Sequence, residues 1–190
     1  MLQFAADVSG DEQTGNHKFM ALIIATDAFV ASTIKRLGTN NIHMNIIQNK
    51  QRKDFILSTI KFDGKEGIAF CVRLDRDIIL AEIKNKNPKR NISRSRIMYN
   101  FNYTLMNQMR EQIDSFLIKH GHELSDIILQ CDSDCQDFAK NNGLCYTDQG
   151  DAHTLADIVA WANNRNKEPE GVIPLDLREE ITTKMKKRFK

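Results

Sequence analysis

Two spacings of apolar residues recur along the chain, and each predicts a different kind of element. Short apolar or β-branched runs bounded by turn residues predict strands at residues 2–8, 18–26, 67–74, 127–129 and 144–147. Apolar residues three or four positions apart predict helices at residues 28–36, 51–60, 78–83, 136–140, 151–162 and 175–188. Asp27 is the expected N-cap of the first helix, and Gly38 is expected to end it.

The longest periodic segment begins after Ser93 or Ser95 and ends at Gly121. Its apolar residues recur every fourth position, at Ile97, Phe101, Leu105, Met109, Ile113 and Leu117. Such a stripe is typical of an amphipathic helix, and we expect it to face the core rather than to form a binding groove.

The order of these elements predicts an α/β domain. A turn rich in Gly, Asp and Asn joins the first two strands, which favours an antiparallel hairpin. Helices separate the later strands, so we expect a mixed sheet flanked by helices. At 190 residues one domain is the default, and we place it at residues 1–167. A linker-like turn then leads into a basic helical extension, residues 168–190, packed on the domain or flanking it.

Composition narrows the protein class only modestly. Hydrophobic residues make up 41% and charged residues 27%, as in ordinary soluble globular proteins. The apolar runs fall short of the ~20 residues that span a bilayer, and the amino terminus lacks the pattern of a signal peptide. We therefore expect a cytoplasmic protein without a membrane partner. The four cysteines are too few for a disulfide scaffold, and Cys131 and Cys135 lack a second close pair, so buried thiols are favoured over a zinc site.

The net charge of +2 is small, but the basic residues are clustered. Between Ile83 and Arg110 there is no acidic residue, and the tail 184–190 is also basic. Such blocks can neutralise phosphates, although a solvated basic loop is the commoner explanation of any one of them. The residues that we expect to bind a nucleic-acid backbone are Lys84, Lys86, Lys89, Arg90, Arg94 and Arg96.

Three aspartates stand out by position. Asp7 ends the first strand, Asp132 ends the Ile-Ile-Leu strand, and Asp157 lies in a helix between apolar neighbours. If the two strands are adjacent and the helix packs across their ends, the three carboxylates converge. Converging carboxylates repel one another unless a cation compensates, and oxygen ligands favour Mg²⁺ or Mn²⁺. Two such ions can activate a water for phosphodiester cleavage.

A structural explanation stands beside this one. Aspartate is common in turns after strands, and each of these acids alone is better explained in that way. Asp151 is similarly explained as a helix N-cap.

The pattern resembles the ribonuclease H-like fold, whose metal-binding acids lie at the ends of the first strand and a later central strand and on a carboxy-terminal helix. More closely, the chain resembles uncharacterised prokaryotic families of that fold, archaeal ones in particular. Those families open with Asp-Glu-Ser-Gly-Asp and a hairpin, carry a His-containing segment before a helix, and close with Ala-Asp-Leu-Val-Ala. The corresponding segments here are Asp7-Val-Ser-Gly-Asp11, Ile42-His-Met44 and Ala156-Asp-Ile-Val-Ala160, in order over about 160 residues.

The resemblance implies that Asp7, Asp132 and Asp157 are catalytic metal ligands, with Asp11 or Asp134 as a fourth. It also implies that His43 either supports a metal ligand from behind or lies on the substrate side. Val8 departs from the pattern, because it replaces the glutamate of the opening motif. A helix between the second and third predicted strands is a second departure, since three strands run consecutively in ribonuclease H itself. His153, four residues before Asp157 on the same helix face, could meet that carboxylate or contact substrate.

Together these observations predict a Mg²⁺- or Mn²⁺-dependent nuclease, or another phosphodiester-processing enzyme. A non-catalytic module of the same fold that binds nucleic acid or a partner is the alternative. A hydrolase of small phosphate esters is a weaker third hypothesis, because no Gly-rich phosphate loop supports it.

Overall fold

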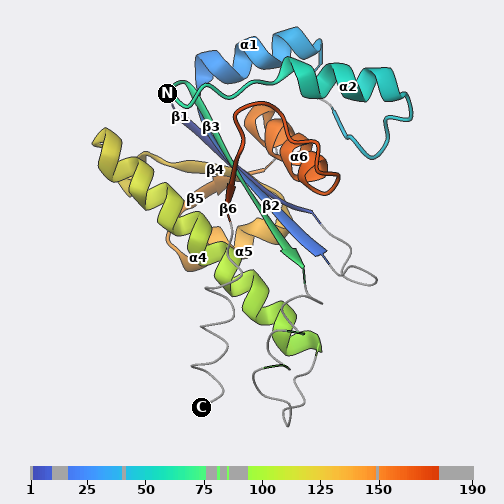
Figure 1. Cartoon of the computed structure of the whole chain (residues 1–190). Coiled ribbons are helices and arrows are strands. Elements are labelled where there is room, and N and C mark those ends of the chain that lie inside the picture. Colours follow the sequence, from blue (N-terminus) through green and yellow to red (C-terminus); the bar gives the residue numbers. More distant parts are fainter. Residues whose placement is uncertain are drawn as a thin grey trace.

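A six-stranded mixed sheet lies between two layers of helices in the computed structural model (Figure 1). The structure describes residues 2–9, 17–39, 42–75, 81, 85, 94–148 and 150–175. The strands are β1 (Leu2–Ser9), β2 (His17–Thr26), β3 (Gly67–Asp75), β4 (Ile128–Cys131), β5 (Cys145–Thr147) and β6 (Ile173–Leu175). The helices are α1 (Asp27–Leu37), α2 (Lys50–Thr59), α4 (Arg94–His120), α5 (Ser133–Asn141) and α6 (Asp151–Asn163), with a short 3-10 turn at Leu124–Asp126. None of these helices is both long and apolar enough to cross a membrane.

The sheet has the order β5-β4-β1-β2-β3-β6. The hairpin partners β1 and β2 are antiparallel, as are β2 and β3, whereas β4 runs parallel to β1 and β5 runs parallel to β4. This arrangement confirms the predicted α/β fold class, a mixed sheet that opens with an antiparallel hairpin and is flanked by helices. Between β2 and β3 the chain forms α1 and α2, so the three strands do not run consecutively.

Side-chain alternation along the strands supplies a separate core on each face of the sheet. On one face Phe4 and Leu22 pack with residues of α4 and α5. On the other face Ala5 and Ile23 pack with residues of α1, α2 and α6. The sheet is therefore covered on both sides, and β1 contributes to both cores.

Helix α1 begins and ends close to where the sequence predicts. The cap is Thr26 rather than Asp27, because the Thr26 hydroxyl accepts a hydrogen bond from the backbone N–H of Phe29 at 3.1 Å. Asp27 is the first helical residue, and its side chain accepts a hydrogen bond from Gln3 instead. Gly38 ends the helix in the left-handed conformation, with φ of 77°.

The apolar stripe predicted for residues 97–117 belongs to α4. It faces the core, as predicted, at the positions whose side chains are described. Met109, Ile113 and Leu117 are buried against the sheet. Ile128, predicted to be buried in a central strand, is instead 53% exposed. The reason is that β4 has only the short strand β5 beyond it, and Ile128 alternates with the buried Ile127 and Leu129.

Helix α6 packs across β1 and β2 and is buried on most of its circumference. A central helix of this kind requires small and apolar residues all round, which the segment Leu155-Ala-Asp-Ile-Val-Ala-Trp-Ala162 supplies. It begins at Asp151 after an N-cap at Gly150, rather than being capped by Asp151. Its side chains are therefore held firmly over the middle of the sheet.

The segment after α6 is more ordered than a linker. Glu170 forms a bridge with Lys61, and β6 pairs in parallel with β3. Residues 168–174 were predicted to be a linker-like turn, and Leu175 to begin the terminal helix; instead Ile173–Leu175 extends the sheet by one edge strand. The rest of the predicted terminal helix lies outside the described residues, as does nearly all of the predicted helix 78–83, and the domain boundary at residue 167 stays a prediction.

Candidate functional site

Asp7 and Asp132 are neighbours because β1 and β4 are parallel and adjacent. Their register pairs Ala5 with Gln130 and Ala6 with Cys131. Continued by one residue, it sets Asp7 beside Asp132, at the shared carboxyl-terminal edge of the two strands. Side chains alternate between faces, so Ala6 and Cys131 point toward α4 and α5, while both aspartates point toward α6.

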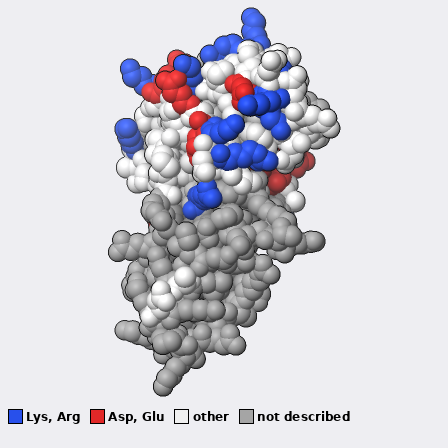
Figure 2. Space-filling model, turned by 45° about the vertical axis from the view of Figure 1, so that its right-hand side comes forward, with Lys and Arg blue, Asp and Glu red and all other residues white. Residues whose placement is uncertain are grey.

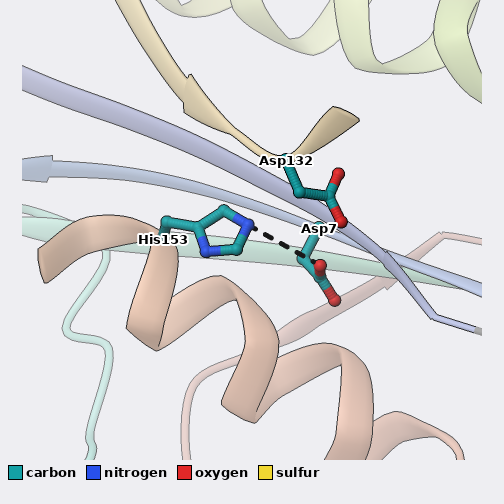
Figure 3. Close-up of side chains that lie close together, drawn as sticks. All are labelled: Asp7, Asp132 and His153. Atoms are coloured by element: carbon teal, nitrogen blue, oxygen red, sulfur yellow. Dashed lines mark ion pairs between the residues drawn. The ribbon is translucent and has the colours of Figure 1, made fainter. Parts of the chain in front are cut away.

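His153 completes the group from the first turn of α6. Its Nε2 atom lies 3.7 Å from Oδ1 of Asp7, and both side chains are largely buried. One ligand atom from each of Asp7, Asp132 and His153 lies within 4.8 Å of the other two. Figure 3 shows the His153 imidazole on α6 beside Asp7 and Asp132, with the ion pair drawn from His153 to Asp7.

This spacing is close to what a single ion requires. Two ligand atoms on one ion lie at most twice the bond length apart, about 4.4 Å for bonds of about 2.2 Å. Atoms already within 4.8 Å of one another therefore need little movement to share a cation. The donor set is two carboxylates and one imidazole.

The neutral form of His153 is favoured where it lies. Burial lowers the pKa of its imidazole, the nearby Asp132 charge raises it, and His43 lowers it further. Nε2 is buried and has no hydrogen-bond partner, since 3.7 Å to Asp7 is too long for a hydrogen bond. A buried polar atom without a partner is costly and calls for an explanation, and a cation at this point would supply one.

Gln130 fixes the start of α6 relative to β4. Gly150 at the N-cap has no side chain, so the Gln130 amide oxygen accepts hydrogen bonds from the backbone N–H groups of Ala152 and His153, at 3.1 and 3.3 Å. A Cβ at Gly150 would lie 2.5 Å from that oxygen, so a larger residue there would displace the Gln130 side chain from the helix start. Strand β4, which Asp132 directly follows, thus holds the helix that carries His153.

The Gln130 side chain also extends a hydrogen-bonded chain toward α1. Its amide nitrogen donates to the Gln3 side chain at 3.0 Å, and Gln3 donates to the Asp27 carboxylate at 2.8 Å. The Gln3 hydrogen bond is the main cause that lowers the pKa of Asp27. A continuous path therefore joins the first residue of α1 to the first turn of α6.

Asp157 lies one helical turn beyond His153 and pairs with His43. The distance from Asp157 Oδ2 to His43 Nδ1 is 3.9 Å, and the histidine side chain is more than half exposed. Burial raises the pKa of Asp157, His43 lowers it, and the charge of Asp132 raises it. Asp157 does not belong to the group of Asp7, Asp132 and His153, whose ligand atoms lie within 4.8 Å of one another. Its role as a metal ligand therefore stays a prediction.

The remaining predicted ligands and cationic residues are described only in part. Asp11, Lys84, Lys86, Lys89 and Arg90 lie outside the described residues. The backbones of Asp134, Arg94 and Arg96 belong to helices, but their side chains are not described. On the part of the surface that Figure 2 describes, Lys and Arg are interspersed with Asp and Glu.

Two residues adjacent to the aspartates point away from the site. Cys131 is fully buried on the α4 side of the sheet, and burial is the main cause that raises the pKa of its thiol to about 11. Val8 is half-buried and packs against that same core. A longer side chain at position 8 would start on the face opposite to Asp7.

Sequence reasoning missed Gln130 and assigned His153 a different contact. Gln130 lies two residues after Ile128 and two before Asp132, so its side chain is on the same face of the strand as both. A polar residue at this position of an otherwise apolar strand was the signal that could have identified it. His153 was predicted to meet Asp157 or substrate, whereas the described ion pair joins it to Asp7.

Comparison with known proteins gives only a distant likeness. No protein-family model and no curated protein matches the chain. Among solved structures, a chain in the PCNA–RNase HII complex from Archaeoglobus fulgidus is similar, with 12% identity and a TM-score of 0.46. The match covers 100% of this chain and 78% of that one. A likeness of this degree carries no information on activity or substrate.

Proposed function

We propose that the protein is a metal-dependent nuclease that hydrolyses phosphodiester bonds of nucleic acid at the Asp7–Asp132–His153 group. The observation that carries this proposal is the convergence of the buried Asp7 and the partly buried Asp132 on the buried imidazole of His153, whose Nε2 atom has no hydrogen-bond partner. Burial of two like charges side by side is unfavourable unless a cation or a proton compensates. A divalent cation satisfies the carboxylates and the imidazole together.

Asp7, Asp132 and His153 would hold the ion, and Asp157, one turn further along α6, would supply another carboxylate. A bound divalent ion lowers the pKa of a water and stabilises a leaving phosphate oxygen. Asp11 and Asp134 are further proposed ligands. His43 is exposed beside Asp157, where it can contact a phosphate.

The basic segment between Ile83 and Arg110 is the proposed contact to the nucleic-acid backbone. Its arginines 94 and 96 belong to the start of α4. Lysine and arginine clusters bind phosphates by displacing counterions, so binding through this segment should weaken steeply as salt rises.

The test is cleavage of RNA, DNA and a hybrid duplex by the whole chain, with Mn²⁺ or Mg²⁺ and with chelator. We expect metal-dependent cleavage that falls at least about 100-fold in Asp7→Asn and Asp132→Asn, because each removes a charged ligand. Asp54→Asn is the matched control, because Asp54 is an exposed aspartate on α2. Equal cleavage by Asp7→Asn and wild type would contradict the proposal.

A binding module without catalysis is the second candidate. It is favoured by Val8, which stands where the resembling families have glutamate. Steeply salt-dependent binding without cleavage in any metal would select this candidate. The orientation of Val8 toward the α4 side weakens its case, since position 8 does not face the Asp7–Asp132–His153 group.

A further inference from the structure

We infer that the Asp7–Asp132–His153 group selects a transition-metal dication, of the class of Mn²⁺, Co²⁺ or Zn²⁺, over Mg²⁺. The inference rests on the proposed function, in that it takes this group to be a metal site. It goes further by assigning His153 as an inner ligand and by making the imidazole, rather than the carboxylates, the source of selectivity.

The chemistry of the donors supports this choice. Mg²⁺ is a hard ion that prefers oxygen ligands and keeps several waters, whereas imidazole nitrogen suits Zn²⁺, Co²⁺ and related ions. Two carboxylates alone would bind either class. The third donor is an imidazole nitrogen of His153, which lies within 4.8 Å of a ligand atom of each aspartate, and this nitrogen separates the two classes.

His153 cannot easily turn away from the group. Only 6% of the residue is exposed, and its backbone N–H is bound to the amide oxygen of Gln130. Ala152 on one side and Leu155 beyond it are fully buried, so α6 has no room to rotate the imidazole into solvent. Any ion held by Asp7 and Asp132 therefore meets the Nε2 atom.

The imidazole is also available to a metal. Its Nε2 atom is buried and has no hydrogen-bond partner, so no other group of the described structure occupies the position that a cation would take. The nearest thiol does not compete, because Cys131 points to the opposite face of the sheet. A thiolate zinc site is thus excluded at this group, and a mixed oxygen and nitrogen site remains.

The experiment measures metal binding to the metal-free full chain, without nucleic acid. Titration calorimetry with Co²⁺, Mn²⁺ and Mg²⁺ gives the affinity ratios, and the visible absorption of Co²⁺ reports its ligands. We expect Co²⁺ and Mn²⁺ to bind at least about tenfold more tightly than Mg²⁺. His153→Ala should reduce the Co²⁺/Mg²⁺ affinity ratio at least about tenfold and change the Co²⁺ spectrum, because nitrogen ligation is lost.

Two variants make the result specific. His153→Asp offers three carboxylates and should move the preference toward Mg²⁺, a gain that a misfolded variant would not show. His122→Ala removes an exposed histidine paired with Asp126 and should leave both the ratio and the spectrum unchanged. Circular dichroism checks that each variant is folded.

The outcomes separate this inference from the proposed function. An unchanged Co²⁺/Mg²⁺ ratio in His153→Ala, or equal binding of Mg²⁺ and Co²⁺ by the wild type, would overturn the selectivity even if the protein cleaves nucleic acid. Histidine-dependent Co²⁺ binding without any cleavage would uphold the site and reject the nuclease.

Discussion

His153 Nε2 lies 3.7 Å from Asp7 Oδ1, with side-chain exposures of only 8% and 10%. The first comes from the start of α6 and the second from the end of β1, so the contact joins the helix to the central strand. The distance is longer than a hydrogen bond and shorter than two metal–ligand bonds end to end. An ion bound by both atoms fits between them.

Metal should stabilise the folded protein through this contact. At a metal concentration of about 100 Kd, mass action adds about 2.7 kcal/mol to the free energy of unfolding. We expect Mn²⁺ to raise the melting temperature of the wild type and of Asp54→Asn, but not that of Asp7→Asn. The measurement is differential scanning calorimetry with and without chelator. A shift of equal size in Asp7→Asn would place the stabilising ion elsewhere.

Gln130→Ala should destabilise α6 and weaken the site. The change removes the acceptor for the N–H groups of Ala152 and His153, a loss comparable to that of a helix N-cap, about 0.5–2 kcal/mol. Metal affinity should fall as well, because His153 loses its backbone anchor. Urea denaturation and metal titration measure the two effects. Gln136→Ala, which breaks an exposed hydrogen bond to Asp148, is the control and should change neither.

Stability should decrease at mildly acidic pH because of His153. Its folded pKa is lowered mainly by burial, so the unfolded state binds a proton more readily. The resulting stability is present above the unfolded pKa of about 6.5 and is lost as pH falls through the lowered folded value. His153→Gln should flatten the decline between about pH 7 and pH 5 in urea denaturation of the metal-free protein. An identical pH profile would show that other groups cause the decline.

Cys145 should be the first thiol to react with a disulfide reagent. It is exposed, whereas Cys71, Cys131 and Cys135 are buried. Burial is the main cause that raises the pKa of Cys71 to about 12 and that of Cys131 to about 11, so few thiolates form. We expect one fast equivalent in native protein, absent in Cys145→Ser, and three more after denaturation. Fast labelling of two thiols in the native state would contradict the described burial.

The apolar stripe of α4 should account for much of its attachment to the sheet. Ile113→Ala should cost about 2–5 kcal/mol, because Ile113 is fully buried and the substitution leaves a cavity. Ile118→Ala on the same helix is the matched control, since Ile118 is 82% exposed and its loss should be nearly neutral. Chemical denaturation of both variants gives the comparison. Equal losses would mean that α4 packs differently.

Much of the fold and half of the site could be predicted from local sequence. Asp7 and Asp132 were recognisable because each follows an apolar strand, and strand ends meet where strands are adjacent. The burial predicted for Ile128 was wrong, because an apolar run does not reveal whether its strand lies at the centre of the sheet or next to a short edge strand. The partners of His153 depended on the tilt of α6 over the sheet, which residue spacing does not determine. Gln130 escaped notice because its amide oxygen bonds backbone groups and its amide nitrogen bonds the side chain of Gln3, which is 127 residues away in the sequence.

The path from Asp27 through Gln3 and Gln130 to the start of α6 has an evolutionary consequence. Each amide on the path bonds the next group along it. Replacement of Gln130 by an apolar residue would remove the donor to the Gln3 amide oxygen, and loss of Gln3 would remove one of the hydrogen bonds that Asp27 accepts. Positions 3, 27 and 130 should therefore change together among homologues. Where position 130 has lost its amide, we expect a polar residue in place of Gly150 to cap the helix.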